Sequence, residues 1–350
     1  MVRKWSGIKT TWDWLKFRYQ ISFARVFHDA ATVRRTLRNN QEFLRARSQF
    51  CEINQITETL LCSPNKEVED MKKKTGSIAE FEENWRELAE SSPYHFKRGD
   101  PEHQIQFAFQ NHWRVFRDVM KTAHAGQALE VGCGRGSMGA FFADAGFETT
   151  LLDTSPTALR IAQSNFLNDD LDGQYVCGDA LNLPFGDDKF DVIVSIGLLE
   201  HFEDIEQAVT EQLRVVRKGG YFLGYVVPER RVSVQLIGKP MNMILKALQS
   251  GIFGRKDLLP NKVPVYRNAY AAESYLRILD KLGVAESASF GMFPVPLISH
   301  SADFPFSVMS AAREKRLVRL WRFLLGLRRG SDPWVCAEKW GLAFLVWAKK

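Results

Sequence analysis

The chain has 350 residues, of which 45% are hydrophobic and 25% are charged, a balance that is typical of a globular protein and excludes intrinsic disorder. Its uninterrupted apolar runs are far shorter than the roughly 20 residues that a membrane-spanning helix needs. Charged residues interrupt the apolar core that a signal peptide would require near the N-terminus, so we expect a cytoplasmic protein. The five cysteines are scattered and include no CxxC pair, so no metal site is expected.

Charge is distributed unevenly along the chain, whose net charge is +6. Residues 1–50 carry 11 Lys and Arg against 3 Asp and Glu, and residues 313–350 carry 10 against 3. Two basic ends therefore flank an acidic middle. Such ends can attract membrane phosphates, nucleic acid or an acidic partner, or they can be solvated helix faces. Because the middle is acidic and no RNA-binding motif is present, we do not expect a nucleic-acid substrate.

The first 100 residues are expected to form a basic, helical N-terminal extension. Over residues 3–27, bulky apolar side chains recur at steps of three and four, which predicts an amphipathic helix with Lys and Arg on its other faces. Further helical segments are expected at 29–62 and 78–91, with a charged linker at 66–76 between them.

In the second region, residues 101–350, a helix is expected at about 102–124. The spacing of apolar residues along the sequence then changes. Short apolar runs alternate with helical segments, which predicts parallel strands joined by crossover helices in a doubly wound α/β sheet. Insertions are expected at about 229–265 and 292–335, the second containing a basic amphipathic helix at 311–327. The strands are expected at 127–131, 148–152, 174–177, 190–195, 220–227 and 341–348, and the helices at 136–145, 156–167, 204–217 and 270–282.

A glycine-rich turn follows the first of these strands, at Gly132-Cys133-Gly134-Arg135-Gly136. Glycines allow the backbone to turn tightly and to approach a ligand closely. The spacing is GxGxG, whereas the dinucleotide-binding fingerprint is GxGxxG. Glu130 precedes the turn by two positions, and a carboxylate there suits a cationic ligand better than a pyrophosphate.

This segment resembles motif I of the class I S-adenosylmethionine (SAM)-dependent methyltransferases, and five further segments match in order. The run Leu183-Pro184-Phe185 with 188–193 is similar to the "methyltransferase 11" group, which includes the ubiquinone-biosynthesis enzymes. The resemblance implies a Rossmann-like, seven-stranded, doubly wound sheet. The other matching segments are 150–153 (motif II), 176–180 (motif III), 195–201 after the fourth strand, and 214–220 before the fifth.

The resemblance also implies which residues hold SAM. Asp153 would accept hydrogen bonds from the ribose hydroxyls, Asp179 would face the adenine amino group, and residues from Ser195 would approach the methionine part. The complete set of expected cofactor-binding residues is Glu130, Gly132, Cys133, Gly134, Gly136, Asp153, Thr154, Asp179, Ala180, Ser195 and Ile196.

His201 is the candidate general base, because it follows the fourth strand at the mouth of the expected pocket. Alternatively, Glu200 and His201 are helix-start residues that serve capping and packing. Some relatives hold a metal through a Glu-x-x-Glu-His pattern here, but this chain has Gly197 at the first position, so no metal is expected.

Aromatic and histidine residues ahead of motif I could fold over the cofactor and substrate, as such segments do in the family, or they could pack between the N-terminal helices and the core. His112 and Trp113 lie in a helical pattern and are expected in the core. The residues that could cover the site are Trp85, Tyr94, His95 and His103.

The sequence therefore predicts an enzyme that moves a methyl group from SAM to oxygen, nitrogen or carbon of a small-molecule or lipid-like acceptor. One alternative is an inactive SAM-fold protein that binds partners or membranes through its basic helices. Another is an NAD-dependent oxidoreductase, since Asp153 lies 21 residues after Gly132. The helices at 3–27 and 311–327 could contact a membrane peripherally or could pack on the core or a second subunit. The acceptor and the oligomeric state stay open.

Overall fold

The computed structural model describes residues 82, 85, 94–121, 125–229, 266–298, 310–327 and 332–350. The helices expected at 3–27 and 29–62, the linker at 66–76 and nearly all of the first expected insertion lie outside the described residues. The expected boundary near residue 100 stays a prediction for the same reason.

The described residues form one eight-stranded sheet in the order β3-β2-β1-β4-β5-β8-β6-β7. Strands β1 to β5 run parallel, whereas β8 is antiparallel to both β5 and β6, and β6 is antiparallel to β7. The predicted doubly wound α/β fold is confirmed, with a two-residue strand beyond the seven expected. The strands are β1 (Gln127–Val131), β2 (Glu148–Asp153), β3 (Gln174–Cys177), β4 (Phe190–Ile196), β5 (Val216–Val226), β6 (Glu286–Met292), β7 (Val335–Cys336) and β8 (Ala343–Lys349).

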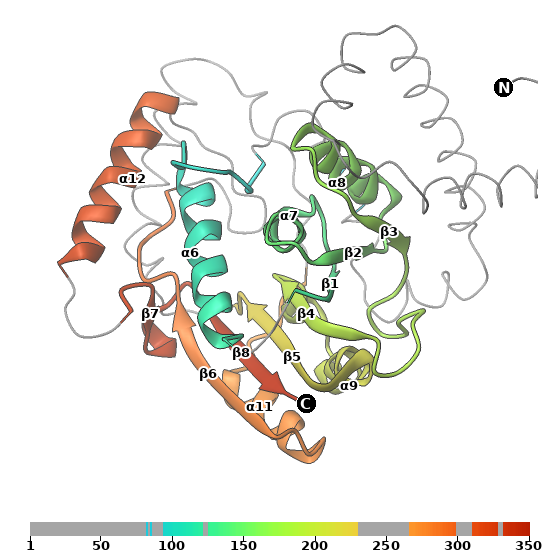
Figure 1. Ribbon diagram of the computed structural model, residues 1–350. Helices are drawn as coiled ribbons and strands as arrows, with labels where there is room; N and C mark the ends of the chain where they lie inside the picture. Colours follow the sequence, from blue (N-terminus) through green and yellow to red (C-terminus); the bar gives the residue numbers. More distant parts are fainter. Residues whose placement is uncertain are drawn as a thin grey trace, which may run out of the picture. The chain divides into compact units, whose positions relative to one another are not determined.

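Helices cover both faces of this sheet (Figure 1). On one face lie α6 (Gln104–Val119), α7 (Ser137–Asp144) and α8 (Pro156–Asn168), and on the other lie α9 (Ile205–Val215) and α11 (Ala272–Lys281). Helix α12 (Ala311–Gly326) packs against α6 at the edge of this layer. The 3₁₀ helices are η1 (Leu199–His201) and η3 (Glu338–Trp340). Within the described ranges, no helix has the length and apolar character needed to span a bilayer.

The central strands are mostly apolar because both of their faces are buried. Ala128 and Val192 join the core beneath α6, α7 and α8, whereas Leu129 and Ile193 join the core beneath α9 and α11. Successive side chains of a strand point to opposite faces, so each strand contributes to both cores.

Two features of the sheet differ from the sequence expectation. Strand β5 begins at Val216 rather than at residue 220, with an irregular register against β4 near Phe190. Strand β6 was missed, because its sequence (ESASFGM) alternates small and polar residues without an apolar period. It forms because all seven of its residues pair with β8, which satisfies the hydrogen-bonding groups of its backbone.

Gly136 precedes α7 with a φ of +69°, a conformation that side chains with a Cβ rarely adopt. A Cβ there would lie 3.1 Å from both Ala162 Cβ and Phe166 Cε2 of α8. We therefore expect Gly136→Ala to lower the free energy of unfolding by about 1–3 kcal/mol, measured by urea denaturation. The matched control is Gly186→Ala, where a Cβ meets open space, and its stability should not change. Equal effects of the two substitutions would contradict this account of Gly136.

Candidate active site

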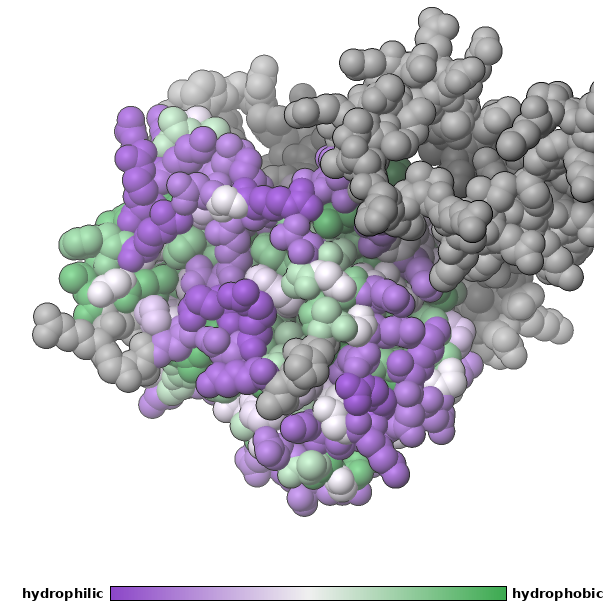
Figure 2. Space-filling model, viewed as in Figure 1, coloured by the Kyte–Doolittle hydropathy of each residue, from purple (hydrophilic) through white to green (hydrophobic). Residues whose placement is uncertain are grey.

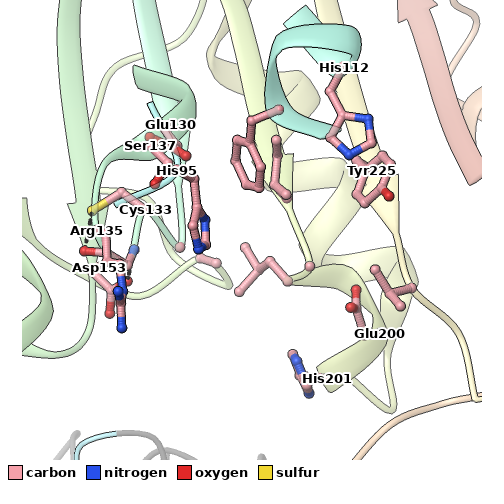
Figure 3. A pocket seen from close by; sticks show the side chains of 18 of the residues that line it. His95, His112, Glu130, Cys133, Arg135, Ser137, Asp153, Glu200, His201 and Tyr225 are labelled. Carbon is pink, nitrogen blue, oxygen red and sulfur yellow. Dashed lines mark hydrogen bonds between the residues drawn. The ribbon is translucent and has the colours of Figure 1, made fainter. Parts of the chain in front are cut away.

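A cavity of about 250 Å³ opens at the carboxyl ends of β1, β2, β4 and β5, the edge where ligands bind in open α/β sheets. Figure 3 shows two groups of side chains around it. We call the first group, around the turn after β1, the glycine-turn half. The second group lies below α6 beside β5, and we call it the aromatic chamber. The glycine-turn half comprises Glu130, Gly132, Cys133, Gly134, Asp153, Thr154, Asp179 and Ala180, and the chamber comprises Ile105, Ala108, Phe109, His112, Tyr225, Phe293, Leu297 and Leu342.

The turn after β1 requires glycine at its first two glycine positions. Gly132 and Gly134 have φ values of +66° and +50°. A Cβ on Gly132 would lie 2.7 Å from Leu198, and one on Gly134 would lie 2.7 Å from Trp85. The Gly134 amide donates a hydrogen bond of 2.8 Å to Asp153 Oδ2, which ties the turn to the end of β2.

Glu130 is buried at the floor of the glycine-turn half. Its Oε2 accepts a 2.7 Å hydrogen bond from the Gly139 amide in the first turn of α7, where the helix dipole favours negative charge. Burial nevertheless dominates and raises the pKa of Glu130 to about 8. In the absence of a nearby cation, this carboxyl group is therefore mostly protonated at pH 7.

Two further carboxyl groups face the same space. Asp153 ends β2 and also accepts a hydrogen bond from the Ser155 amide, yet burial raises its pKa to about 6. Asp179 follows β3 and accepts a 3.0 Å hydrogen bond from the Leu181 amide, and burial raises its pKa as well. Three carboxyl groups held in one poorly solvated cavity fit a ligand that brings positive charge and hydrogen-bond donors.

Most residues predicted to bind the cofactor line this cavity. These are Glu130, Gly132, Cys133, Gly134, Asp153, Thr154, Asp179, Ala180 and Ile196. Gly136 and Ser195 do not line it. Gly136 packs against α8, as described above, and Ser195 is fully buried within β4. Residue roles in cofactor binding stay predictions.

Two of the four residues expected to cover the site line the cavity, namely Trp85 and His95. The Trp85 ring lies under the Arg135 guanidinium, 5.4 Å from the ring centre. Tyr94 and His103 do not line the cavity. Tyr94 packs near Phe96, and His103 accepts a hydrogen bond from the Gln106 amide at the start of α6.

His201, the predicted base, lines the cavity with its ring held by backbone carbonyls. Nδ1 lies 2.6 Å from the backbone carbonyl oxygen of Tyr266, and the Gly197 carbonyl contacts the ring as well. A carbonyl only accepts, so Nδ1 carries the proton. Burial lowers the pKa of His201 to about 4, so the ring is neutral at pH 7 and a weak base.

Glu200, which the sequence interpretation left as a helix-start residue, lines the cavity beside His201 (Figure 3). The side chain is fully buried, and neither carboxylate oxygen accepts a well-formed hydrogen bond from the described residues. Burial raises its pKa to about 7, although the Arg267 guanidinium partly offsets this effect. A buried carboxyl group with a pKa near neutrality is suited to accept a proton. Its position directly after β4 was the available signal in the sequence.

His112 is buried among aromatic rings, as expected for a core residue, but it also forms part of the chamber wall. The Trp334 indole donates a 3.0 Å hydrogen bond to His112 Nδ1. Burial lowers the pKa of His112 to about 3, so the neutral ring carries its single proton on Nε2. The chamber is thus apolar with one fixed N–H group in its wall.

The described residues contain no group of three or more His, Cys, Asp or Glu side chains placed to hold a metal ion.

Comparisons with known proteins point to one family. Residues 129–224 match the model of a methyltransferase domain. The chain is 28% identical over 202 residues to a demethylmenaquinone methyltransferase of Chlorobaculum tepidum, covering 54% of this chain and 80% of that protein. It is 33% identical over 98 residues to a phthiotriol/phenolphthiotriol dimycocerosates methyltransferase of Mycobacterium tuberculosis, covering 27% of this chain and 36% of that protein. A solved structure of a Pyrococcus horikoshii protein aligns with a TM-score of 0.43 at 21% identity, covering 60% of this chain and 92% of that one.

Proposed function

Because this chain belongs to the class I SAM-dependent methyltransferases, we propose that its methyl acceptor is an apolar, lipid-like molecule bound in the aromatic chamber. The observation that carries the proposal is the continuity of the cavity. One space joins the carboxyl groups of the glycine-turn half to a chamber lined mainly by apolar side chains. The relatives named for demethylmenaquinone and for dimycocerosates act on molecules of this kind.

The glycine-turn half would hold SAM. Its three carboxyl groups, two buried and one half-buried, match a ligand with an ammonium, a sulfonium and ribose hydroxyls, because the cations would offset the cost of burying negative charge. When bound, SAM supplies a methyl group already activated for displacement, which leaves to the protein the tasks of positioning and desolvation.

The chamber would orient the acceptor. Phe109, Phe293 and Leu297 offer apolar contact, and burying an apolar acceptor there releases surface water. The Nε2–H group of His112 gives the chamber one directional donor for a carbonyl or phenolic oxygen of the acceptor.

Glu200 would remove the acceptor's proton. Neither of its buried oxygens makes a hydrogen bond of good geometry with the described residues, so a hydroxyl, amine or acidic C–H group brought to it gains a strong acceptor. His201, the base expected from the sequence, would hold the adjacent loop through its contacts with Tyr266 and Gly197. We also propose that the protein acts in the cytoplasm at the membrane surface, where such acceptors reside.

SAM should bind the purified chain, and Asp179→Ala should weaken that binding about 10- to 100-fold, since a hydrogen bond to a charged group is worth roughly 1.5–3 kcal/mol. Isothermal titration calorimetry measures both. The control is Asp280→Ala, an exposed acid on α11, which should leave the affinity unchanged. NADH should not compete with SAM. Displacement of SAM by NADH would favour the oxidoreductase alternative instead.

The acceptor class is tested with tritium-labelled SAM and two probes that share a dihydroxynaphthalene ring. One is a short-chain demethylmenaquinol, and the other carries a sulfonate in place of the chain. We expect label in the apolar probe with a kcat/KM at least about tenfold higher, because the chamber residues carry no cation and Arg267, which lines the cavity near them, interacts with Glu200. Preference for the sulfonate, or absence of transfer to both this probe and a total lipid extract, would contradict the proposal.

Glu200→Gln should lower kcat about 10²- to 10³-fold while KM and the SAM affinity change little, because the amide cannot accept the proton. In the unsubstituted protein, the rate should fall as the pH drops through about 7, where Glu200 becomes protonated. The control Glu203→Gln alters an exposed acid three residues away and should keep both rate and pH profile. If His201 were the base, the fall would lie near pH 4 and would persist in Glu200→Gln but vanish in His201→Asn.

A further inference from the structure

Helix α12 exposes an apolar stripe on the face that points away from the protein. Leu320, Phe323, Leu324 and Leu327 are 47%, 64%, 41% and 61% exposed. Their spacing of i, i+3, i+4 and i+7 places them on one face of the helix. The face that packs on α6 holds Glu314, Val318 and Leu325, half a turn away. Figure 2 shows the resulting hydrophobic surface at the edge where Figure 1 places α12.

Basic side chains flank this stripe. Arg313, Arg316 and Arg319 are exposed, and none of them forms an ion pair with the described part of the chain. Lys315 and Arg322 on the same helix pair with Glu102 and Asp100. Large exposed apolar side chains beside exposed arginines are the features of a helix that lies in a membrane interface, where the apolar face enters the acyl region and the arginines meet lipid phosphates.

The helix is anchored directly to the chamber wall. Glu314 is buried and accepts hydrogen bonds from the backbone amide (3.0 Å) and the side-chain amide (3.3 Å) of Gln104, the first residue of α6. Gln104 Oε1 in turn accepts a 3.1 Å hydrogen bond from the Ile298 amide. The next residue after Gln104, Ile105, and the residue before Ile298, Leu297, both line the chamber.

We propose that α12 docks the enzyme on a bilayer containing anionic phospholipids, so that the chamber receives its acceptor from the membrane. The proposal rests on the apolar acceptor proposed above, and it names the surface that brings enzyme and acceptor together. Apolar contact through Phe323 and Leu327 would seat the helix, and the arginines would select anionic lipid.

A second copy of this chain fits the surface less well. In a two-fold dimer the same patch meets itself, which brings two patches of like positive charge close together. An anionic membrane presents opposite charge to all of the arginines at once, which is why the membrane is the occupant that the charges favour.

The test is flotation of the full chain with vesicles of phosphatidylcholine, with or without phosphatidylglycerol. The unsubstituted chain should float with the anionic vesicles. The triple variant Leu320→Ser, Phe323→Ser, Leu327→Ser should lose at least about tenfold in partitioning. The double variant Arg316→Glu, Arg319→Glu should lose binding only where phosphatidylglycerol is present. Matched controls are Leu167→Ser with Leu282→Ser, which alter exposed leucines elsewhere, and Lys121→Glu with Lys218→Glu.

All α12 substitutions fall on exposed positions, and retained SAM binding shows that each variant is folded. Flotation of the triple variant equal to that of the unsubstituted chain would overturn the proposal, as would failure of the unsubstituted chain to float. A vesicle-free dimer that the triple variant dissociates, seen by light scattering, would assign the stripe to a second copy instead. Because flotation needs neither SAM nor methyl transfer, its failure is distinct from failure of the proposed function.

Discussion

Three carboxyl groups line one cavity, those of Glu130 and Asp153 buried and that of Asp179 half-buried, and the cost of charging them there shapes the rest of the site. Each group accepts a hydrogen bond from a backbone amide, that of Gly139, Gly134 and Leu181 respectively. The carboxyl groups therefore also hold these backbone segments in place. Those amides do not cancel the effect of burial, since all three pKa values lie above their ordinary range. Positive charge on a ligand would favour the charged carboxylates, so a sulfonium nucleoside suits this cavity better than a pyrophosphate does.

The aromatic chamber differs from the glycine-turn half, because most of the side chains in its wall are apolar. His112 and Glu200 are polar groups in an apolar wall, and each has a defined state. Trp334 fixes the proton of His112 on Nε2, whereas burial leaves Glu200 near half-protonation at pH 7. A donor and a proton acceptor set in apolar surroundings can orient a molecule that is mostly hydrocarbon but carries one reactive polar group. Helix α12 is joined to α6 through the buried Glu314, and it exposes apolar side chains on the outer surface of the protein.

Much of the fold could be predicted from the sequence because the central parallel strands are largely buried and therefore appear as short, mostly apolar runs between helical segments. Strand β1 matches its expected bounds. Strand β6 could not be found in this way, because pairing with β8 rather than apolar periodicity stabilises it. The early start of β5 at Val216 depends on pairing with Phe190, which local sequence does not encode.

The glycine-turn half was predictable for a topological reason, since acids at the ends of neighbouring parallel strands must meet at one edge of the sheet. The chamber was not. Its residues come from α6, β5, the segment after β6 and the residue before β8, and nothing in their local patterns brings them together. His112 has the periodicity of a core residue and is buried like one, so only its contact with Trp334, 222 residues away, reveals its fixed proton. Glu200 is a candidate base because burial raises its pKa, and the burial of a single acidic residue cannot be read from the sequence.

Counting protons shows whether the positive charge of a bound ligand ionises the buried Glu130 carboxyl group. Calorimetric titration of SAM at pH 7, in buffers that differ in ionisation enthalpy, gives the number released on binding. Glu130 has a pKa of about 8 and is mostly protonated before binding, whereas a neighbouring cation favours its carboxylate. We expect SAM binding to release close to one proton in the unsubstituted protein and none in Glu130→Gln. Binding of SAM with no proton release, or with release unchanged in Glu130→Gln, would contradict this expectation.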